Sequence, residues 1–297
     1  MRIFQVDAFT RSRFTGNPAT VVLDAQGRDD ALLRDVAREF AHAEVVFALP
    51  PTDPGHDLWL RFFNTRKEAP FVGHATVAAH AVLLELGLRE IGLCRQRSGT
   101  GTLEVLASRE TATGQARIEF RQSVPELAAP LPLKTTLRVA EALGLPGARL
   151  HDDLPARVAR KGGSRLLVPV ADPQALDGLA PQSDSLLALG RELDVDGFFT
   201  FSFLHDGAGP CTESRMFCPA LGIAEDPVSG NAHAMLATYL LDAGLLPRGP
   251  SRFVGHQGMQ LGRPGRVDVS LEFEGSRHTA VRIAGEAVIV SEGRLAE

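Results

Sequence analysis

The sequence predicts an α+β protein built from two related halves, and three observations support this prediction. Short runs that alternate apolar and polar residues, typical of strands, are interspersed with helical segments along the whole chain. Two of the helical segments are apolar on nearly every side, which indicates helices surrounded by protein. These two segments also resemble each other, which indicates an internal repeat.

Length and composition allow one large core or two smaller ones. The chain has 297 residues, of which 44% are hydrophobic and 23% are charged, so it can form two halves of about 100 to 150 residues each. Its formal net charge of −5 and its isoelectric point near 6.0 provide no basic surface for nucleic acid or an anionic membrane. We therefore expect neither as a partner.

The N-terminal residues alternate in polarity like a strand and lack the apolar region of a secretory signal. No apolar run approaches the roughly 18 residues of a membrane span, so a cytoplasmic location is expected. Cys94, Cys211 and Cys218 form no paired motif, which favours reduced structural thiols over a disulfide framework or a zinc site.

The first half is expected to contain two helices. The first runs from about Asp30 to Phe40, with Asp29 or Asp30 as its N-cap and apolar residues on one face. The second lies within residues 70–88, PFVGHATVAAHAVLLELGL, with Gly87 as its candidate C-cap. Strands are expected at 3–9, 19–25, 43–49, 58–63, 102–108 and 116–123.

A proline-rich, irregular segment at 124–136 is the best candidate for a boundary between the halves. We expect halves at 1–125 and 126–285, with a last strand near 286–297 that packs back onto the first half. In the second half, helices are expected near 134–144, 183–191 and from about Asn231, and strands at 164–170, 197–204 and 266–275, followed by the last strand near 287–293.

The repeat becomes visible when Gly73 is aligned with Gly230, which lies 157 residues later. PFVGHATVAAHAVLLELGL then matches PVSGNAHAMLATYLLDAGL at 7 of 19 positions, whereas average composition gives roughly one or two. The identities include the first proline, the glycine at the helix start, a Leu-Leu pair and the final Gly-Leu. Each half is therefore expected to wrap a curved, mostly antiparallel sheet around one buried helix.

The starts of these two helices are candidate anion sites. A helix N-terminus has unpaired backbone N–H groups and a partial positive charge, and glycine lets an anion approach the backbone closely. Two such starts, at Gly73 and Gly230, can bind a small anionic substrate in a cleft between the halves. The alternative, that both glycines only form tight turns, is equally compatible with the spacing.

Three polar side chains near these starts are candidates for proton transfer. Glu44 precedes an apolar run, where loss of solvent would raise its pKa toward neutrality. Viewed alone, Glu44 is compatible with a solvated charge, Asp226 with a turn before proline, and His74 with a packed side chain. His74 and His80 are six residues apart, which does not favour a metal site, and no complete phosphate-binding motif occurs.

Five segments spread over the whole chain carry the motifs of one known family, and the blocks GHAT and EDPxSGNA are specific in combination. With these motifs the chain resembles the PhzF-like phenazine-biosynthesis family of the diaminopimelate-epimerase-like superfamily. The five segments are QVDAFTRSRFTGNPATVVLDA, HAEVVFAL, LRFFNTRKEAPFVGHATVAAHAVL, ESRMFCPALGIAEDPVSGNAHAML and GHQGMQLGRPGRVDV.

The resemblance implies two pseudo-symmetric α+β halves with the active site between them, usually in a homodimer. It also implies isomerisation without a cofactor or a metal, on a small carboxylate such as a dihydro-3-hydroxyanthranilate. Carried over by motif, the glutamate that moves the proton is Glu44, and His74 and Asp226 are its catalytic partners. The residues expected to bind the substrate are Gly73, Ala75, Ser229, Gly230 and Asn231.

This sequence departs from relatives of the fold at several of these positions. Racemases of the wider fold use two thiols, where this chain has Val72 and Ser229, so two-thiol racemisation is not expected. The serine usual after the second glycine is Asn231, which keeps a donor and an acceptor but is larger. The serine usual before the glutamate is Ala43.

Together these features predict a cofactor-independent isomerase. The alternative of another class is a non-catalytic small-carboxylate binding or regulatory protein that keeps the cleft without the reaction. A structural or partner-binding protein is a third interpretation, favoured if side chains fill the cleft.

Overall fold

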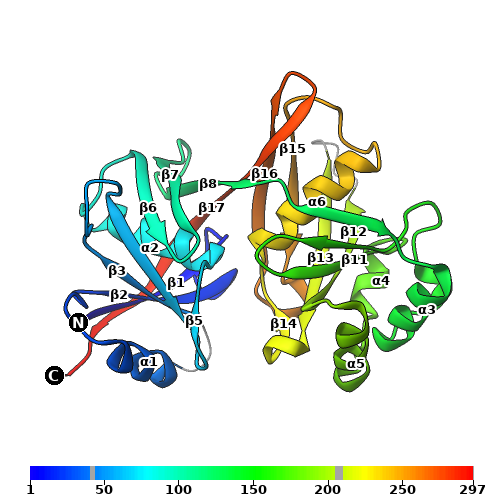
Figure 1. Ribbon diagram of the computed structural model, residues 1–297, viewed down its shortest axis with the longest axis horizontal. Coiled ribbons are helices and arrows are strands. Elements are labelled where there is room, and N and C mark those ends of the chain that lie inside the picture. Colours follow the sequence, from blue (N-terminus) through cyan, green and yellow to red (C-terminus); the bar gives the residue numbers. More distant parts are fainter. Residues whose placement is uncertain (41–43, 205–209, 297) are drawn as a thin grey trace. The chain divides into compact units, whose positions relative to one another are not determined.

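The computed structural model describes residues 1–40, 44–204 and 210–296, and its chain divides into two compact units. The first unit comprises Met1–Gln122 and Ile283–Glu297, and the second comprises Ser123–Arg282. The long last strand, β17 (Arg277–Arg294), drawn in red in Figure 1, begins in the second unit and ends in the first.

The first unit is a mostly antiparallel sheet with two helices, α1 (Asp30–Glu39) and α2 (Gly73–Glu85). Strand β1 lies between β2 and β17 and is antiparallel to both. The strands, besides the end of β17, are β1 (Arg2–Ala8), β2 (Asn17–Leu23), β3 (Val45–Leu49), β4 (Leu58–Phe63), β5 (Glu68–Ala69), β6 (Gly92–Ser98), β7 (Gly101–Arg109) and β8 (Ala116–Ser123).

The second unit also combines a mixed sheet with helices. Its strands are β9 (Glu126–Pro130), β10 (Arg157–Arg160), β11 (Ser164–Pro169), β12 (Gly197–Leu204), β13 (Cys211–Cys218), β14 (Ile223–Asp226), β15 (Ser251–Gln257) and β16 (Gly265–Glu274). Its helices are α3 (Leu133–Ala142), α4 (Pro173–Asp177), α5 (Ser183–Leu193) and α6 (Gly230–Asp242), with short 3₁₀ turns η1 (Gly147–Arg149), η2 (Pro219–Leu221) and η3 (Met259–Leu261).

Both units repeat one order of strand pairing, which confirms the expected pseudo-symmetry. The pairs β2–β3 and β11–β12 are parallel, and they are connected through α1 in the first unit and through α4 and α5 in the second. The pairs β3–β4 and β12–β13 are antiparallel, and β4–β6 and β13–β15 are parallel across α2 and α6. Helices α2 and α6 each contain 13 residues, and both ends match the offset found in the sequence.

The two long helices are buried, as their apolar sequences predicted. Every residue of α2 from Ala75 to Leu84 is buried, because the helix packs on β1, β2, β3 and β7 of its own unit. Helix α6 packs on β9, β10, β11 and β16. Gly87 and Gly244 follow the helices in the left-handed conformation, with φ of 66° and 74°, which permits the same chain reversal in both units.

Two local predictions have different outcomes. Asp29 is the N-cap of α1, and its side chain accepts a hydrogen bond from the N–H of Leu32. The expectation of an irregular segment at 124–136 is wrong, because β9 pairs with β10 there and α3 begins at Leu133. Among the described residues, no helix has the length and apolarity needed to cross a membrane.

Candidate active site

Glu44 is fixed in place by the sheet of the first unit. It immediately precedes β3, and its backbone carbonyl accepts a hydrogen bond of 3.1 Å from the N–H of Thr20 on β2. This bond extends the parallel pairing of β2 with β3. The side chain of Glu44 is 26% exposed, so the carboxylate is both held and accessible.

His74 lies in the first turn of α2 and pairs with Glu44. Its Nε2 atom is 3.3 Å from Oε2 of Glu44, and its side chain is 11% exposed. Gly73, which precedes it, lies against Phe120, since a Cβ atom at Gly73 would lie 3.2 Å from Cζ of that ring. Glycine at the helix start therefore has a packing reason, in addition to any role in ligand binding.

The pKa of Glu44 lies below its ordinary value. Burial raises it, but the hydrogen bond and charge attraction from His74, together with a backbone hydrogen bond, outweigh burial. The expectation of a raised pKa is thus wrong, because the sequence showed the apolar surroundings and not the imidazole. At neutral pH the carboxylate is ionised, which is the form that accepts a proton.

The start of α6 in the second unit has the same backbone geometry as the start of α2. The N-cap residues Val72 and Ser229 are both extended, with φ of −137° and −116°. Ser229 also caps α6 with its side chain, since its Oγ atom accepts a hydrogen bond of 3.2 Å from the N–H of Ala232. In both helices the first N–H groups have no acceptor within the helix.

Asp226 ends β14, directly after a nearly buried ion pair that secures this strand. Both carboxylate oxygens of Glu225 accept hydrogen bonds from Arg215, at 2.9 and 2.8 Å, and the two side chains are only 9% and 11% exposed. Arg215 donates a further bond to the carbonyl of Leu176. Glu225 is thus engaged in a structural contact, and Asp226 beside it is half-buried.

Asn231, in the first turn of α6, contacts the turn between β10 and β11. Its Nδ2 atom donates a hydrogen bond of 3.0 Å to the carbonyl of Lys161. A serine hydroxyl is too short to span the same distance from this position. The larger side chain therefore links the first turn of α6 to the 161–163 turn.

The structure places the site residues predicted from the sequence in two groups. Gly73, His74 and Ala75 lie at the start of α2 in the same unit as Glu44. Asp226, Ser229, Gly230 and Asn231 lie at the start of α6 in the second unit. Ala43 lies outside the described residues.

Sequence reasoning gave no role to Arg215 or Gln257, which both contact the segment around Asp226. Gln257 is fully buried and bonds to Asp226 and Ser229. The signal in the sequence is the motif GHQG, in which two glycines flank a polar pair within an otherwise alternating strand.

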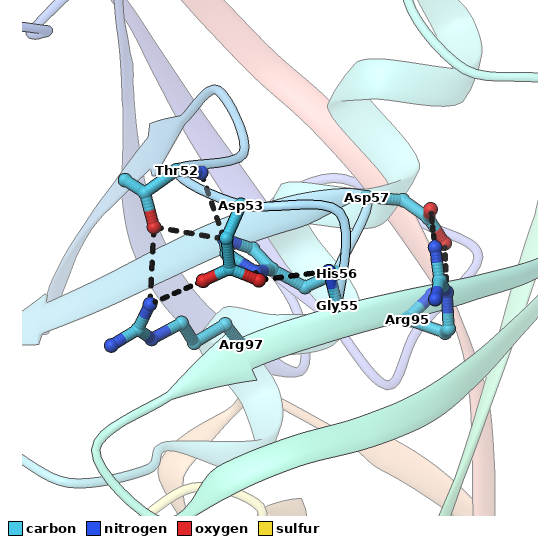
Figure 2. Close-up of polar contacts among 7 residues, drawn as sticks. All are labelled: Thr52, Asp53, Gly55, His56, Asp57, Arg95 and Arg97. Atoms are coloured by element: carbon cyan, nitrogen blue, oxygen red, sulfur yellow. Dashed lines mark hydrogen bonds and ion pairs between the residues drawn. The ribbon is translucent and has the colours of Figure 1, made fainter.

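A second polar cluster, shown in Figure 2, holds the loop between β3 and β4 of the first unit. His56 is buried, and its Nδ1 atom is 3.2 Å from Asp53, which also pairs with Arg97 on β6. Hydrogen bonds from Arg95 lower the pKa of Asp57 to about 2. Because these groups satisfy one another, we assign the cluster a structural role.

Neither a disulfide nor a metal site is supported by the part of the chain that is described. Cys94, Cys211 and Cys218 are buried and form no disulfide. Within the described ranges, no three His, Cys, Asp or Glu side chains are grouped so that they could hold a metal ion.

A family model described as "Phenazine biosynthesis-like protein" (PhzC-PhzF) matches residues 6–293. The chain belongs to this family. The uncharacterized isomerase YddE of Escherichia coli K12 is 36% identical over 294 residues, which covers 97% of this chain and 96% of the relative. The trans-2,3-dihydro-3-hydroxyanthranilate isomerase of Pseudomonas aeruginosa is 30% identical over 294 residues, 99% of this chain and 98% of the relative.

Solved structures agree with this family membership. A phenazine biosynthesis protein of the PhzF family from Bacillus anthracis has a TM-score of 0.90 and 25% identity, covering 100% of this chain and 99% of that one. A hydroxyproline epimerase from Agrobacterium vitis, at 13% identity, shares the fold with a TM-score of 0.65 and covers 99% of this chain and 91% of its own. The expected α+β epimerase-like fold and the expected isomerase class are confirmed.

Proposed function

We propose that this protein is a cofactor-independent isomerase in which Glu44 moves a proton on a small carboxylate substrate. The observation that carries the proposal is the pair of Glu44 and His74, 3.3 Å apart, at the start of a buried helix. The carboxylate is ionised and partly exposed, so it can act as a base without first losing a proton.

The proposed reaction conserves atoms and electrons. Glu44 accepts the proton of an acidic C–H bond, and the electron pair of that bond moves into an adjacent conjugated system. Glu44, now protonated, returns the proton to another carbon of the same system. The net change is an isomerisation, which needs no oxidant or reductant, and a dihydro-3-hydroxyanthranilate has the required arrangement of ring double bonds.

In this proposal the helix starts bind the substrate. The substrate carboxylate is attracted by the backbone N–H groups at the two helix starts, those of Gly73 and Ala75 in α2 and those of Gly230 and Asn231 in α6. The N-cap Ser229 fixes the direction of the N–H groups of α6. His74 stabilises negative charge as the C–H bond breaks, and Asp226 orients a polar group of the substrate. The matching N-cap conformations of the two helices support a substrate-binding role for each helix start.

The test is proton exchange in deuterated water, with trans-2,3-dihydro-3-hydroxyanthranilate as the first substrate and a panel of small cyclic carboxylates after it. Wild type should isomerise a substrate, and the new C–H position should carry the transferred proton, or deuterium to the extent that the protonated Glu44 exchanges with solvent before the return. Glu44→Gln should lower turnover by about 10²- to 10⁴-fold while remaining folded. Glu39→Gln, which changes an exposed carboxylate at the end of α1, should keep full turnover.

Two results would contradict the proposal. Full turnover in Glu44→Gln would remove Glu44 as the base. Thermal stabilisation by several carboxylates without conversion of any of them would instead favour the non-catalytic binding protein.

We also propose that the protein acts as a cytoplasmic homodimer that binds neither nucleic acid nor a membrane. The family resemblance supports the dimer, and the net charge of −5 supports the lack of polyanionic partners. Sedimentation equilibrium checks the dimer, since a single species of 31.8 kDa would contradict it.

A further inference from the structure

The short loop from Asp226 to Gly230 joins β14 to α6 and carries the second group of site residues. Gln257, at the end of β15, is fully buried and binds this loop at both ends. Its Nε2 group donates a hydrogen bond of 2.6 Å to the carbonyl of Asp226. Its Oε1 atom accepts a hydrogen bond of 3.0 Å from the N–H of Ser229.

Gly255, two residues before Gln257, brings the strand against His233, which bonds to Ser229. A Cβ atom at Gly255 would lie 2.0 Å from Cδ2 of His233, so only glycine leaves room for the buried ring. His233 in turn donates a hydrogen bond of 2.7 Å from Nδ1 to the carbonyl of Ser229. Burial lowers the pKa of His233 to about 4, so this ring is neutral at pH 7.

The glycine after Gln257 brings the chain against the middle of the loop. Gly258 has φ of 89°, and a Cβ atom there would lie 2.8 Å from the carbonyl oxygen of Pro227. The segment Gly255–Gly258 therefore contacts the 226–230 loop directly at Gln257 and Gly258, and through the ring of His233 at Gly255. The contacts at Gly255 and Gly258 need the absence of a side chain, and the contact at Gln257 needs a group that both donates and accepts a hydrogen bond.

We propose that Gln257 is a positioning residue for the isomerase site. It holds Asp226 and the start of α6 at a fixed separation, because one planar amide bonds to both ends of the loop. A carboxylate in its place cannot donate to Asp226, and a hydrocarbon can make neither bond. This inference rests on the proposed function for its catalytic consequence, whereas its structural part stands on the hydrogen bonds alone.

Two variants test the role of Gln257 in turnover. Gln257→Met should lower kcat by about 10- to 100-fold, because small displacements of site groups have effects of this size. Gln257→Glu should be nearly as active as wild type at low pH, where the protonated carboxyl donates to Asp226 and accepts from Ser229. Its kcat should fall as pH rises through the pKa of the introduced carboxyl, which burial raises.

The matched control is Gln96→Met. Gln96 is also fully buried, and it accepts a hydrogen bond from His80 in the first unit, so its replacement measures the general effect of losing a buried amide. Gln96→Met should lower the melting temperature but keep kcat within about twofold of wild type. Equal kcat losses in both methionine variants, or wild-type kcat and pH profile in both Gln257 variants, would overturn the positioning role.

A readout without substrate separates this inference from the proposed function. The amide proton of Ser229 should exchange with deuterium at least about tenfold faster in Gln257→Met than in wild type, and that of Thr20, in the first unit, should be unchanged. Unchanged exchange at Ser229 would overturn the inference. Full turnover in Glu44→Gln would overturn the proposed function and leave the exchange result intact.

Discussion

The imidazole of His74 lies 3.3 Å from the carboxylate of Glu44, although 30 residues separate them in the sequence. His74 counteracts the effect of burial on Glu44, and the result is a pKa below the ordinary value. The pair therefore keeps a partly desolvated carboxylate ionised.

Replacement of His74 should raise the pKa of Glu44. In His74→Ala the two contributions from the imidazole are lost while burial remains, so the change has a positive sign. Carbon-detected NMR titration of the glutamate side chains measures this directly in wild type and variant. A pKa of Glu44 that is unchanged or lower in His74→Ala would contradict the assigned cause.

Removing one partner of the Arg215–Glu225 ion pair should lower the free energy of unfolding more than replacing both partners with apolar residues. Arg215→Met leaves a nearly buried carboxylate unpaired and should lower the free energy of unfolding by about 3 to 5 kcal/mol. Arg215→Met combined with Glu225→Leu should recover part of this loss. Urea denaturation measures the free energy of unfolding of the single and the double variant.

The exposed pair Arg138–Glu192, which is also joined by two hydrogen bonds, is the matched control for this ion pair. Arg138→Met should have a much smaller effect, because solvent screens the pair. Equal effects at the two sites would mean that burial does not govern the contribution of Arg215.

Gly255→Ala should destabilise the second unit. The added methyl group would overlap the ring of His233, and overpacking of this kind typically lowers stability by about 1 to 3 kcal/mol. Gly293→Ala, also in a strand but with open space at its Cβ position, should have little effect. Chemical denaturation compares the two, and an unaffected Gly255→Ala would contradict the close contact.

Buried His80 should make the protein less stable as pH falls. Burial, followed by the charge of Arg89, lowers its pKa to about 3, so below about pH 6.5 the unfolded chain binds a proton that the folded chain does not. This effect amounts to about 2 kcal/mol between pH 7 and pH 5. His80→Gln should flatten the pH dependence of the unfolding free energy in that window, and an unchanged slope would contradict the assignment.

The sequence predicted the elements in which apolar side chains occupy the buried positions. Helices α2 and α6 were recognised because nearly every residue is apolar, and their matching ends followed from the repeat. Strand β6 was missed because its pattern is inverted: Leu93 is exposed, whereas Gln96 and Ser98 are buried. Strand β9 was missed because it ends in proline and buries little surface.

The site was only partly predictable for a related reason. The motifs identified Glu44, His74 and Asp226 as candidates, but the sign of the pKa shift of Glu44 depends on a distance that only the folded chain defines. Arg215 and Gln257 lie in strands, 11 and 31 residues from Asp226, and their contacts depend on how β13, β14 and β15 pair.

The path of β17 determines the order in which the protein can be completed during synthesis. Strand β1 is made first, but one of its two neighbours consists of residues 287–294, near the C-terminal end. Until the ribosome has released that segment, one edge of β1 lacks its native partner, and exposed edges promote aggregation. The unit whose first strand is translated early therefore cannot complete its native sheet until residues 287–294 have been made.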